Sequence, residues 1–290
     1  METITFTCKV ITPMFLAGAD GKTPELRAPS IKGAMRFWWR AMRSDLVGSG
    51  GYAALAKEEG ALFGGTGDQA SRSSFSLRVS VGEQKVYSEE RLVPHDSRKG
   101  IQKAFAPGQQ FQVTILTAKK ENIDKLVALF YVVSVLGGIG KRSRRGMGAF
   151  AIAEVKRNGE ITENLYPDTV DQLLRLIKKV STHFDKKGDK IVCVSSKTPD
   201  YPFIKEIEWG KPDSRILDKI SRTTHDLKSQ NGQVYEVSLG HASGGRFASP
   251  IYVSVKEGNI PVMTTLNTAP NRDKHRINFS LQDEFKSKIL

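Results

Sequence analysis

The stretch that decides the fold is LVALFYVVSVLGGIGKRSRRGMGAFAIAEV, residues 126–155. Its first part is almost entirely apolar, which predicts a buried helix, and its last part alternates in the manner of a strand. Between them a glycine-rich loop, residues 137–148, carries four cations between glycine pairs: Lys141, Arg142, Arg144 and Arg145. The sequence therefore predicts a helix-to-strand turn with concentrated positive charge.

Segments with strand and helix periodicity surround this unit in the first half of the chain. The pattern predicts strands at 4–12, 74–81, 110–118 and 148–155, helices at 30–43, 52–63 and 122–136, and a long polar loop at 83–108. The main elements follow the order β-α-β-β-α-β, the split βαβ pattern of ferredoxin-like domains. RNA-recognition modules share this plan, but the fold also hosts many unrelated functions.

The second half begins after a polar segment at 156–169 that has the composition of a linker. The pattern predicts helices at 171–184 and 214–227 and strands at 190–196, 201–209, 233–239, 249–255 and 260–266. We expect an α+β protein of two ferredoxin-like (RRM-like) β-α-β-β-α-β domains, residues 1–157 and 158–290. The second domain is expected to be a degraded copy of the plan.

The charge balance indicates a polyanionic partner. The 290 residues hold 44 Lys and Arg against 31 Asp and Glu, which gives a net charge of +13 and a pI near 9.7. Such an excess favours RNA or DNA, with an anionic membrane surface as the weaker alternative. The sequence has no apolar run long enough to span a bilayer and no signal-peptide pattern at METITFTCKV. We therefore expect a soluble, cytoplasmic protein without membrane attachment.

The sequence shows no pattern for a metal, a disulfide framework or a nucleotide cofactor. Cys8 and Cys193 lie in predicted strands as buried thiols, and the five histidines have no metal-ligand spacing. Nucleotide-binding glycine loops run from strand into helix, whereas this loop runs from helix into strand. Arg142 also follows Lys141 where a phosphate-binding loop has Ser or Thr. We therefore expect neither a metal nor a cofactor.

The glycine loop has the chemistry of a phosphate contact. Glycine lets main-chain N–H groups come close to an anion, and arginine presents a planar fork that matches phosphate oxygens. The alternative is a solvated basic turn bounded by glycines.

The helix at 30–43 places two kinds of side chain on neighbouring faces. Ile31, Met35, Trp38 and Met42 form the expected core stripe. The adjacent face collects Lys32, Arg36, Arg40 and Arg43, with no acid on the helix to pair with them. Trp39 lies at the boundary, where an indole stacks on a base or packs in the core. We expect this cationic face and the glycine loop to form one furrow for a nucleotide strand.

Four segments together resemble the RAMP superfamily of CRISPR-associated proteins. They are RAPSIKGAMRFWWRAMR from Arg27, LFGG from Leu62, GGIGKRSRRGMG from Gly137 and GGRFASPIYVSV from Gly244. Within the superfamily the chain is most similar to the family of first subunits of the type III-B (Cmr) effector complex.

The resemblance implies two ferredoxin-like domains and a subunit that binds the 3′ region of the CRISPR RNA and helps to capture target single-stranded RNA, beside other Cmr and RAMP subunits. It implies that this subunit does not cut target RNA. The family's loop contacts map to Gly138, Gly140, Lys141, Arg142, Arg144 and Arg145, and the GGRFASP segment adds Arg246.

Two other functions stay open from the sequence. A metal-independent RAMP endoribonuclease would need a histidine base, for which His95 and His241 are the candidates, and Asp20 is a weaker candidate acid in a turn. A scaffold that touches only neighbouring subunits is the second alternative. The favoured hypothesis is a non-catalytic RNA-binding subunit of a CRISPR ribonucleoprotein that acts in antiviral defence.

Overall fold

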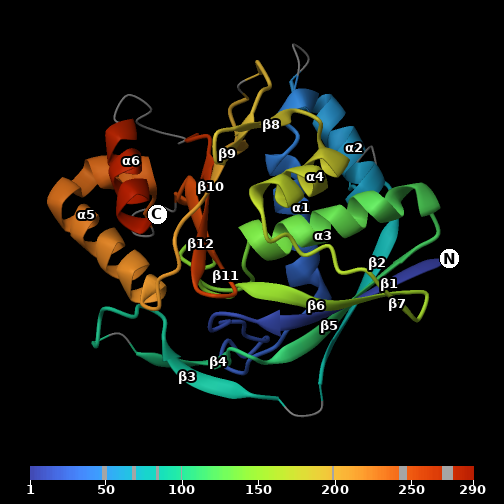
Figure 1. Cartoon of the computed structure of the whole chain (residues 1–290), viewed down its shortest axis with the longest axis horizontal. Coiled ribbons are helices and arrows are strands. Elements are labelled where there is room, and N and C mark those ends of the chain that lie inside the picture. The colour runs from blue at the N-terminus through green and yellow to red at the C-terminus, as the bar shows by residue number, and fades with distance from the viewer. Residues whose placement is uncertain are drawn as a thin grey trace.

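The computed structural model describes residues 1–47, 51–66, 70–82, 85–98, 100–197, 199–241, 247–269 and 277–290. Within these residues the chain forms two five-stranded antiparallel sheets and a separate two-stranded hairpin, with helices between and beside the sheets (Figure 1). The α+β class predicted from the sequence is confirmed.

The first sheet has the strand order β2-β5-β1-β6-β7. Its strands are β1 (Glu2–Val10), β2 (Phe75–Val81), β5 (Gln110–Thr117), β6 (Phe150–Arg157) and β7 (Glu160–Thr162). In the central strand, Phe6 pairs with Val113 on one side and Val155 on the other. Alternate β1 residues are buried, as the pleat requires of a sheet with one covered face. Helices α1 (Ala28–Ala41) and α3 (Ile123–Leu136) cover that face.

Helix α3 is apolar on nearly all sides and is buried almost along its whole length. A helix of this kind needs apolar neighbours in every direction. It packs on β6 below, on α1 and α4 (Val170–Val180) beside it, and on β11 and β12 of the second sheet. The ring of Phe130, for example, lies 4.6 Å from that of Phe6 in β1.

The second sheet has the order β11-β12-β10-β9-β8. Its strands are β8 (Phe184–Lys187), β9 (Lys190–Cys193), β10 (Ile204–Trp209), β11 (Ile251–Lys256) and β12 (Ile260–Leu266). One face meets α3, and the other is covered by α5 (Ile216–Leu239) and α6 (Phe279–Ile289), which Figure 1 shows on the far side of the sheet. The order β11-β12-β10 repeats β2-β5-β1, and β9 takes the place beside β10 that β6 takes beside β1.

Three sequence-based assignments need correction. The segment 233–239, predicted as a strand, continues α5 beyond a kink at Gly232, because Tyr235 and Leu239 lie one turn apart and are both buried. The long loop at 83–108 contains the hairpin of β3 (Tyr87–Arg91) and β4 (Ile101–Phe105). Helix α1 begins at Ala28 with Pro29 in its first turn, two residues before the predicted start.

The core does not divide at the predicted boundary between residues 157 and 158. Leu173 and Ile177 of α4 belong to the same buried cluster as Phe6 of β1. The Tyr131 hydroxyl of α3 donates to Asn164 Oδ1 at 2.9 Å, which ties the connecting segment to the helix. The two-domain division therefore stays a prediction, with a shared core across it. No helix in the described part of the chain is long and apolar enough to cross a membrane.

We expect Ile177→Ala to lower the free energy of unfolding by about 2–5 kcal/mol, because it opens a cavity in the shared core. Ile161→Ala is the matched control, since Ile161 is 68% exposed, and it should change stability by less than about 0.5 kcal/mol. Urea denaturation followed by circular dichroism and tryptophan fluorescence measures both. Two separate transitions, with only the second shifted by Ile177→Ala, would show that the halves fold independently.

Candidate nucleic-acid interface

The glycine loop at 137–148 packs against the edge of the second sheet. The Gly146 N–H donates to the Val253 carbonyl at 2.8 Å, and the Val253 N–H donates to the Arg144 carbonyl at 3.2 Å. Its other side meets the segment after β1, because the Lys141 N–H donates to the Phe15 carbonyl at 2.9 Å. The loop therefore fastens the first sheet, the segment after β1 and strand β11 to one another.

Arg144 and Arg145 make contacts within the protein. Arg145 donates to the carbonyls of Leu239 and Ile251 at 3.2 and 3.0 Å and to Ser249 Oγ at 3.1 Å. Arg144 donates to the Ser249 carbonyl, and its guanidinium lies 5.1 Å from the Phe37 ring and 5.3 Å from the Tyr252 ring. Burial lowers the pKa of Arg144. Tertiary contacts thus occupy both arginines that the sequence predicts as RNA contacts.

The glycines of the loop are required by packing. A side chain on Gly138 would meet the Met147 carbonyl, and one on Gly140, whose φ is +101°, would meet the Phe15 carbonyl. The glycines were expected to let an anion approach the backbone. They instead let neighbouring segments of the protein backbone pack closely against the loop. Lys141 is the fully exposed cation of the loop, and Arg142 is half-buried.

The cationic face of α1 is paired with acids from the neighbouring helix α2 (Ala53–Phe63). Glu59 forms ion pairs with Arg36 and Arg40. Arg43 is buried, pairing with Asp45 at 3.1 Å and Glu58 at 3.0 Å. The acids that pair with this face lie outside α1, on α2 and at Asp45, where the periodicity of α1 gives no sign of them. Arg36 and Arg40 nevertheless keep 41% and 46% of their side-chain surface exposed.

The core stripe of α1 is confirmed, with Ile31, Met35, Trp38 and Met42 all at most 1% exposed. Trp39 is also only 1% exposed and packs on Phe63, so the hypothesis that it stacks on a base is wrong. Lys32 lies 5.1 Å from the Phe75 ring, and burial lowers its pKa. At the boundary of the polar face, burial of the large apolar indole of Trp39 is favoured over its exposure to solvent.

An aromatic pair, with Tyr52 exposed and Tyr201 half-buried, lies beside the carboxyl-terminal end of α1. Tyr52 is 46% exposed, and its ring centroid lies 5.9 Å from that of Tyr201. The Tyr201 hydroxyl donates to the Arg40 carbonyl at 3.3 Å, which holds the pair beside the end of α1. No spacing in the sequence links these two tyrosines, so the pair was not predicted.

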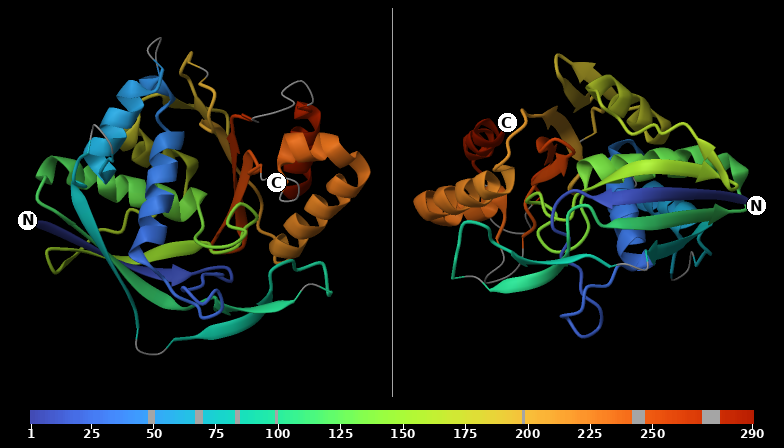
Figure 2. Two further views of the ribbon diagram at one scale, coloured as in Figure 1. Left: turned by 180° about the vertical axis from the view of Figure 1, so that it is seen from behind. Right: turned by 60° about the horizontal axis from the view of Figure 1, so that its bottom comes forward.

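Three lysines from three separate segments line one cavity of about 530 Å³. They are Lys22 in the segment after β1, Lys103 in β4 and Lys141 in the glycine loop. Figure 2 shows the segment after β1 lying beside the β3–β4 hairpin, and a bridge between Met14 and Phe105 joins them.

Within the described ranges none of these three lysines has an acidic partner at ion-pair distance. Lys141 donates to Gln102 Oε1 at 3.0 Å, and Lys103 lies 4.5 Å from the Tyr87 ring. We call this group the lysine pocket. Its chemistry suits a phosphate-bearing ligand.

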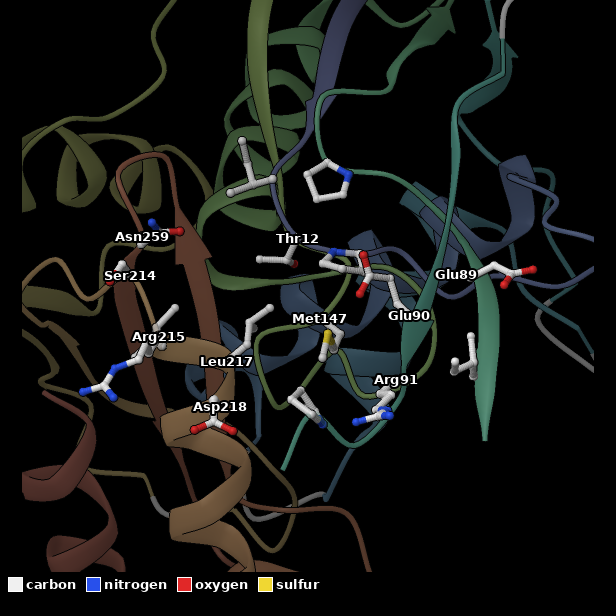
Figure 3. Close-up of a pocket in the computed structure, with 16 residues that line it drawn as sticks. Thr12, Glu89, Glu90, Arg91, Met147, Ser214, Arg215, Leu217, Asp218 and Asn259 are labelled. Atoms are coloured by element: carbon white, nitrogen blue, oxygen red, sulfur yellow. The ribbon is translucent and has the colours of Figure 1, made fainter. Parts of the chain in front are cut away.

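Another cavity, of about 770 Å³, has mixed charge. Figure 3 shows Glu89, Glu90 and Arg91 of β3 on one side and Arg215 and Asp218 at the start of α5 on the other. The acids make this cavity unsuited to a nucleic-acid backbone.

The candidate catalytic residues have other surroundings. Asp20 accepts the N–H groups of Lys22 and Thr23, both at 2.9 Å, as a turn residue does. His95 shares a hydrogen bond with Ser221, and the His241 N–H donates to the Phe247 carbonyl. Arg246 lies outside the described residues. Cys8 is buried and Cys193 half-buried, and no described group of His, Cys, Asp and Glu is arranged to hold a metal ion.

The α+β fold and its glycine loop have a counterpart among known families. The model of the RAMP superfamily matches residues 7–151, which is half of the chain, and the chain belongs to this superfamily.

Two curated relatives come from Pyrococcus furiosus. The chain is 29% identical over 233 residues to CRISPR system Cmr subunit Cmr1-1, a match that covers 71% of this chain and 65% of the relative's length. It is 26% identical over 178 residues to Cmr subunit Cmr1-2, covering 51% of this chain and 93% of that protein. The chain thus spans less than two thirds of the first relative.

Solved structures share the whole fold. The crystal structure of apo Cmr1 from Pyrococcus furiosus has a TM-score of 0.66 at 20% identity and covers 100% of this chain and 97% of that one. A chain of the type III-B Cmr-beta complex bound to cognate target RNA has a TM-score of 0.61 at 12% identity, with both chains covered completely.

We expect Arg145→Ala to lower the free energy of unfolding by about 2–4 kcal/mol, because it removes hydrogen bonds from a charged donor to two carbonyls and a hydroxyl. Lys141→Ala, in the same loop but exposed, should change it by less than about 0.5 kcal/mol. Urea unfolding curves compare the two variants with the parent protein. Equal stability of the two variants would contradict the assignment of Arg145 as a tertiary contact.

Proposed function

We propose that the chain is a subunit of a type III-B CRISPR effector ribonucleoprotein that binds single-stranded RNA without cutting it. Its similarity to Cmr1 proteins and the fold shared with a chain of a target-RNA complex support the assignment to that assembly. Its partners in this proposal are CRISPR RNA, target RNA and neighbouring Cmr subunits. The observation that carries the RNA contact is the lysine pocket.

The lysine pocket suits a flexible polyphosphate chain for two reasons. Lys22, Lys103 and Lys141 come from different segments, so their charges are fixed near one another by tertiary structure and remain exposed. Neutralising them with phosphates releases counterions from the RNA, which favours binding and makes it dependent on salt. No described acid lies at ion-pair distance from these three like charges, and a bound phosphate relieves their mutual repulsion.

The exposed side of α1 is a second proposed contact. Arg36 and Arg40 share a single carboxylate, Glu59, so the three groups together keep one net positive charge. The Tyr52–Tyr201 pair beside Arg40 offers the exposed aromatic surface on which a base stacks. It takes the role first assigned to Trp39.

The strand order supports a ferredoxin-like interpretation of both halves. In the first half, β2-β5-β1-β6 is antiparallel, and α1 and α3 form the two crossovers. In the second half, β10, α5, β11, β12 and α6 follow the same succession, with β9 in place of the final strand. The second unit lacks the final strand of the ferredoxin-like succession. We propose that it is degraded in this respect.

The triple substitution of Lys22, Lys103 and Lys141 to Ala tests the RNA contact. We expect affinity for a single-stranded RNA oligonucleotide to fall about tenfold or more at low salt, and the slope of log K against log salt to become shallower by about two. Fluorescence anisotropy at several salt concentrations measures both quantities. The control is the triple substitution of Lys119, Lys179 and Lys187, which are exposed elsewhere. Equal losses in the two variants would reduce the effect to net charge and contradict the site.

Glu59→Gln tests the contribution of α1. Removing the carboxylate frees Arg36 and Arg40, so we expect tighter RNA binding and a salt slope steeper by about 0.7 for each new phosphate contact. Glu58→Gln is the matched control on the same helix, because its partner Arg43 is buried and out of reach of RNA. The same anisotropy assay compares them, and unchanged affinity in Glu59→Gln would remove α1 from the interface.

A further inference from the structure

Two histidines meet where the β3–β4 connection packs on α5. The ring centroids of His95 and His225 lie 4.8 Å apart, with the rings tilted by 41°. His95 Nδ1 lies 2.6 Å from Ser221 Oγ, which fixes the imidazole against the helix. His225 is exposed and His95 half-buried, so a ligand reaches the pair from solvent.

Two cationic side chains lie close enough to act electrostatically on His95. Arg222 contributes from α5 and Arg142 from the glycine loop, and both charges act on His95. Burial is the largest cause that lowers the pKa of His95, the neighbouring His225 is the next, and Asp96 on its own connection acts in the opposite direction.

The acids near the histidine pair already have partners. Asp96 pairs with Arg98 at 3.1 Å, and Asp218 pairs with Arg222 at 2.6 Å. Asp226 also acts on Arg222. These acids neutralise Arg98 and Arg222, so Arg142 is the cation of the group that has no described acid at ion-pair distance.

Arg142 carries a half-buried charge that suits an anionic ligand. Its φ of +57° is unusual for a residue with a side chain, and burial lowers the pKa of its guanidinium. Within the described residues its guanidinium makes no ion pair and no hydrogen bond. A half-buried charge without a partner is costly, and an anion supplies the lacking partner. Arg144 and Arg145, by contrast, are occupied by carbonyls.

We propose that Arg142, His95 and His225 form a phosphate-binding site that takes a backbone phosphate of RNA and binds it more tightly as the pH falls. The RNA assignment rests on the proposed function. Arg142 directly follows Lys141, so a strand held in the lysine pocket passes to this site along the loop.

The sign of the pH effect follows from linkage. In the free protein His95 is largely neutral near pH 7.5, because its pKa is lowered from 6.5. A phosphate beside the ring favours the protonated form, so binding takes up a proton. Affinity must therefore rise as the pH decreases from about 8 to about 6, and a coupling of about one pKa unit corresponds to about tenfold.

The first experiment uses the full chain and inorganic phosphate. Histidine resonances are followed by NMR across pH with and without phosphate. We expect phosphate to raise the titration midpoint of His95 and to shift the resonances of His225, while those of His183, which lies 3.8 Å from Asp45, stay unchanged. Arg142→Gln should abolish both effects with an unchanged circular dichroism spectrum. The same response in all three histidines, or none in His95, overturns the site.

The second experiment measures RNA affinity at pH 6 and pH 8. We expect the His95→Gln/His225→Gln variant to lose most of the roughly tenfold gain at low pH that the parent shows. The His183→Gln control should retain it. Phosphate binding at the histidines with an unaltered RNA profile would assign the site to free phosphate and overturn the RNA part. If substitution of the lysine pocket leaves RNA affinity unchanged while phosphate still titrates His95, the proposed function fails and the phosphate site stands.

Discussion

The structure depends on the burial of one helix that is apolar on every side. Helix α3 has too little polar surface to face solvent, so the first sheet, the second sheet, α1 and α4 must all pack around it. That requirement joins the two halves of the chain into one core. It also fixes the place of the glycine loop, which begins where α3 ends and has to run along the edge strand β11.

The position of the loop decides how its cations are used. A guanidinium has five donors in a fixed fork, which suits a group of carbonyls at the end of a sheet. Arg145 satisfies three such acceptors, and Arg144 lies between the rings of Phe37 and Tyr252. The same loop thus divides its charge between tertiary structure, through Arg144 and Arg145, and a free surface at Lys141 and Arg142. The glycine loop therefore connects the two sheets through Arg144 and Arg145, although its composition resembles that of a phosphate-binding loop.

Pairing, more than the number of charges, determines where a polyanion can bind. On α1, Glu59 of α2 pairs with Arg36 and Arg40, and the buried Arg43 pairs with Glu58 of α2 and with Asp45. In the lysine pocket none of the three cations has an ion-pair partner among the residues that the structure describes. Of the residues that give the net charge of +13, the lysines of this pocket come from separate segments, so no single stretch of sequence predicts their position. The proposed function requires such a surface, because a subunit of a ribonucleoprotein needs exposed cations and a rigid frame to hold them.

The sequence by itself determined the elements whose periodicity is strong: the buried stripe of Ile31, Met35 and Trp38, the apolar helix α3, and the strands of the first half. It also determined the family, because the motifs of the RAMP superfamily are local. It missed the helical state of 233–239, where alternation in Val234, Tyr235 and Val237 imitates a strand, and the burial of Trp39. Only the tertiary structure decided which cations are free, since Glu59, Ser249 and Leu239 are far in sequence from the arginines they bind. Periodicity predicts which side of a single helix or strand is buried. Ion pairs and hydrogen bonds between segments depend on distances that are set only when the segments pack together.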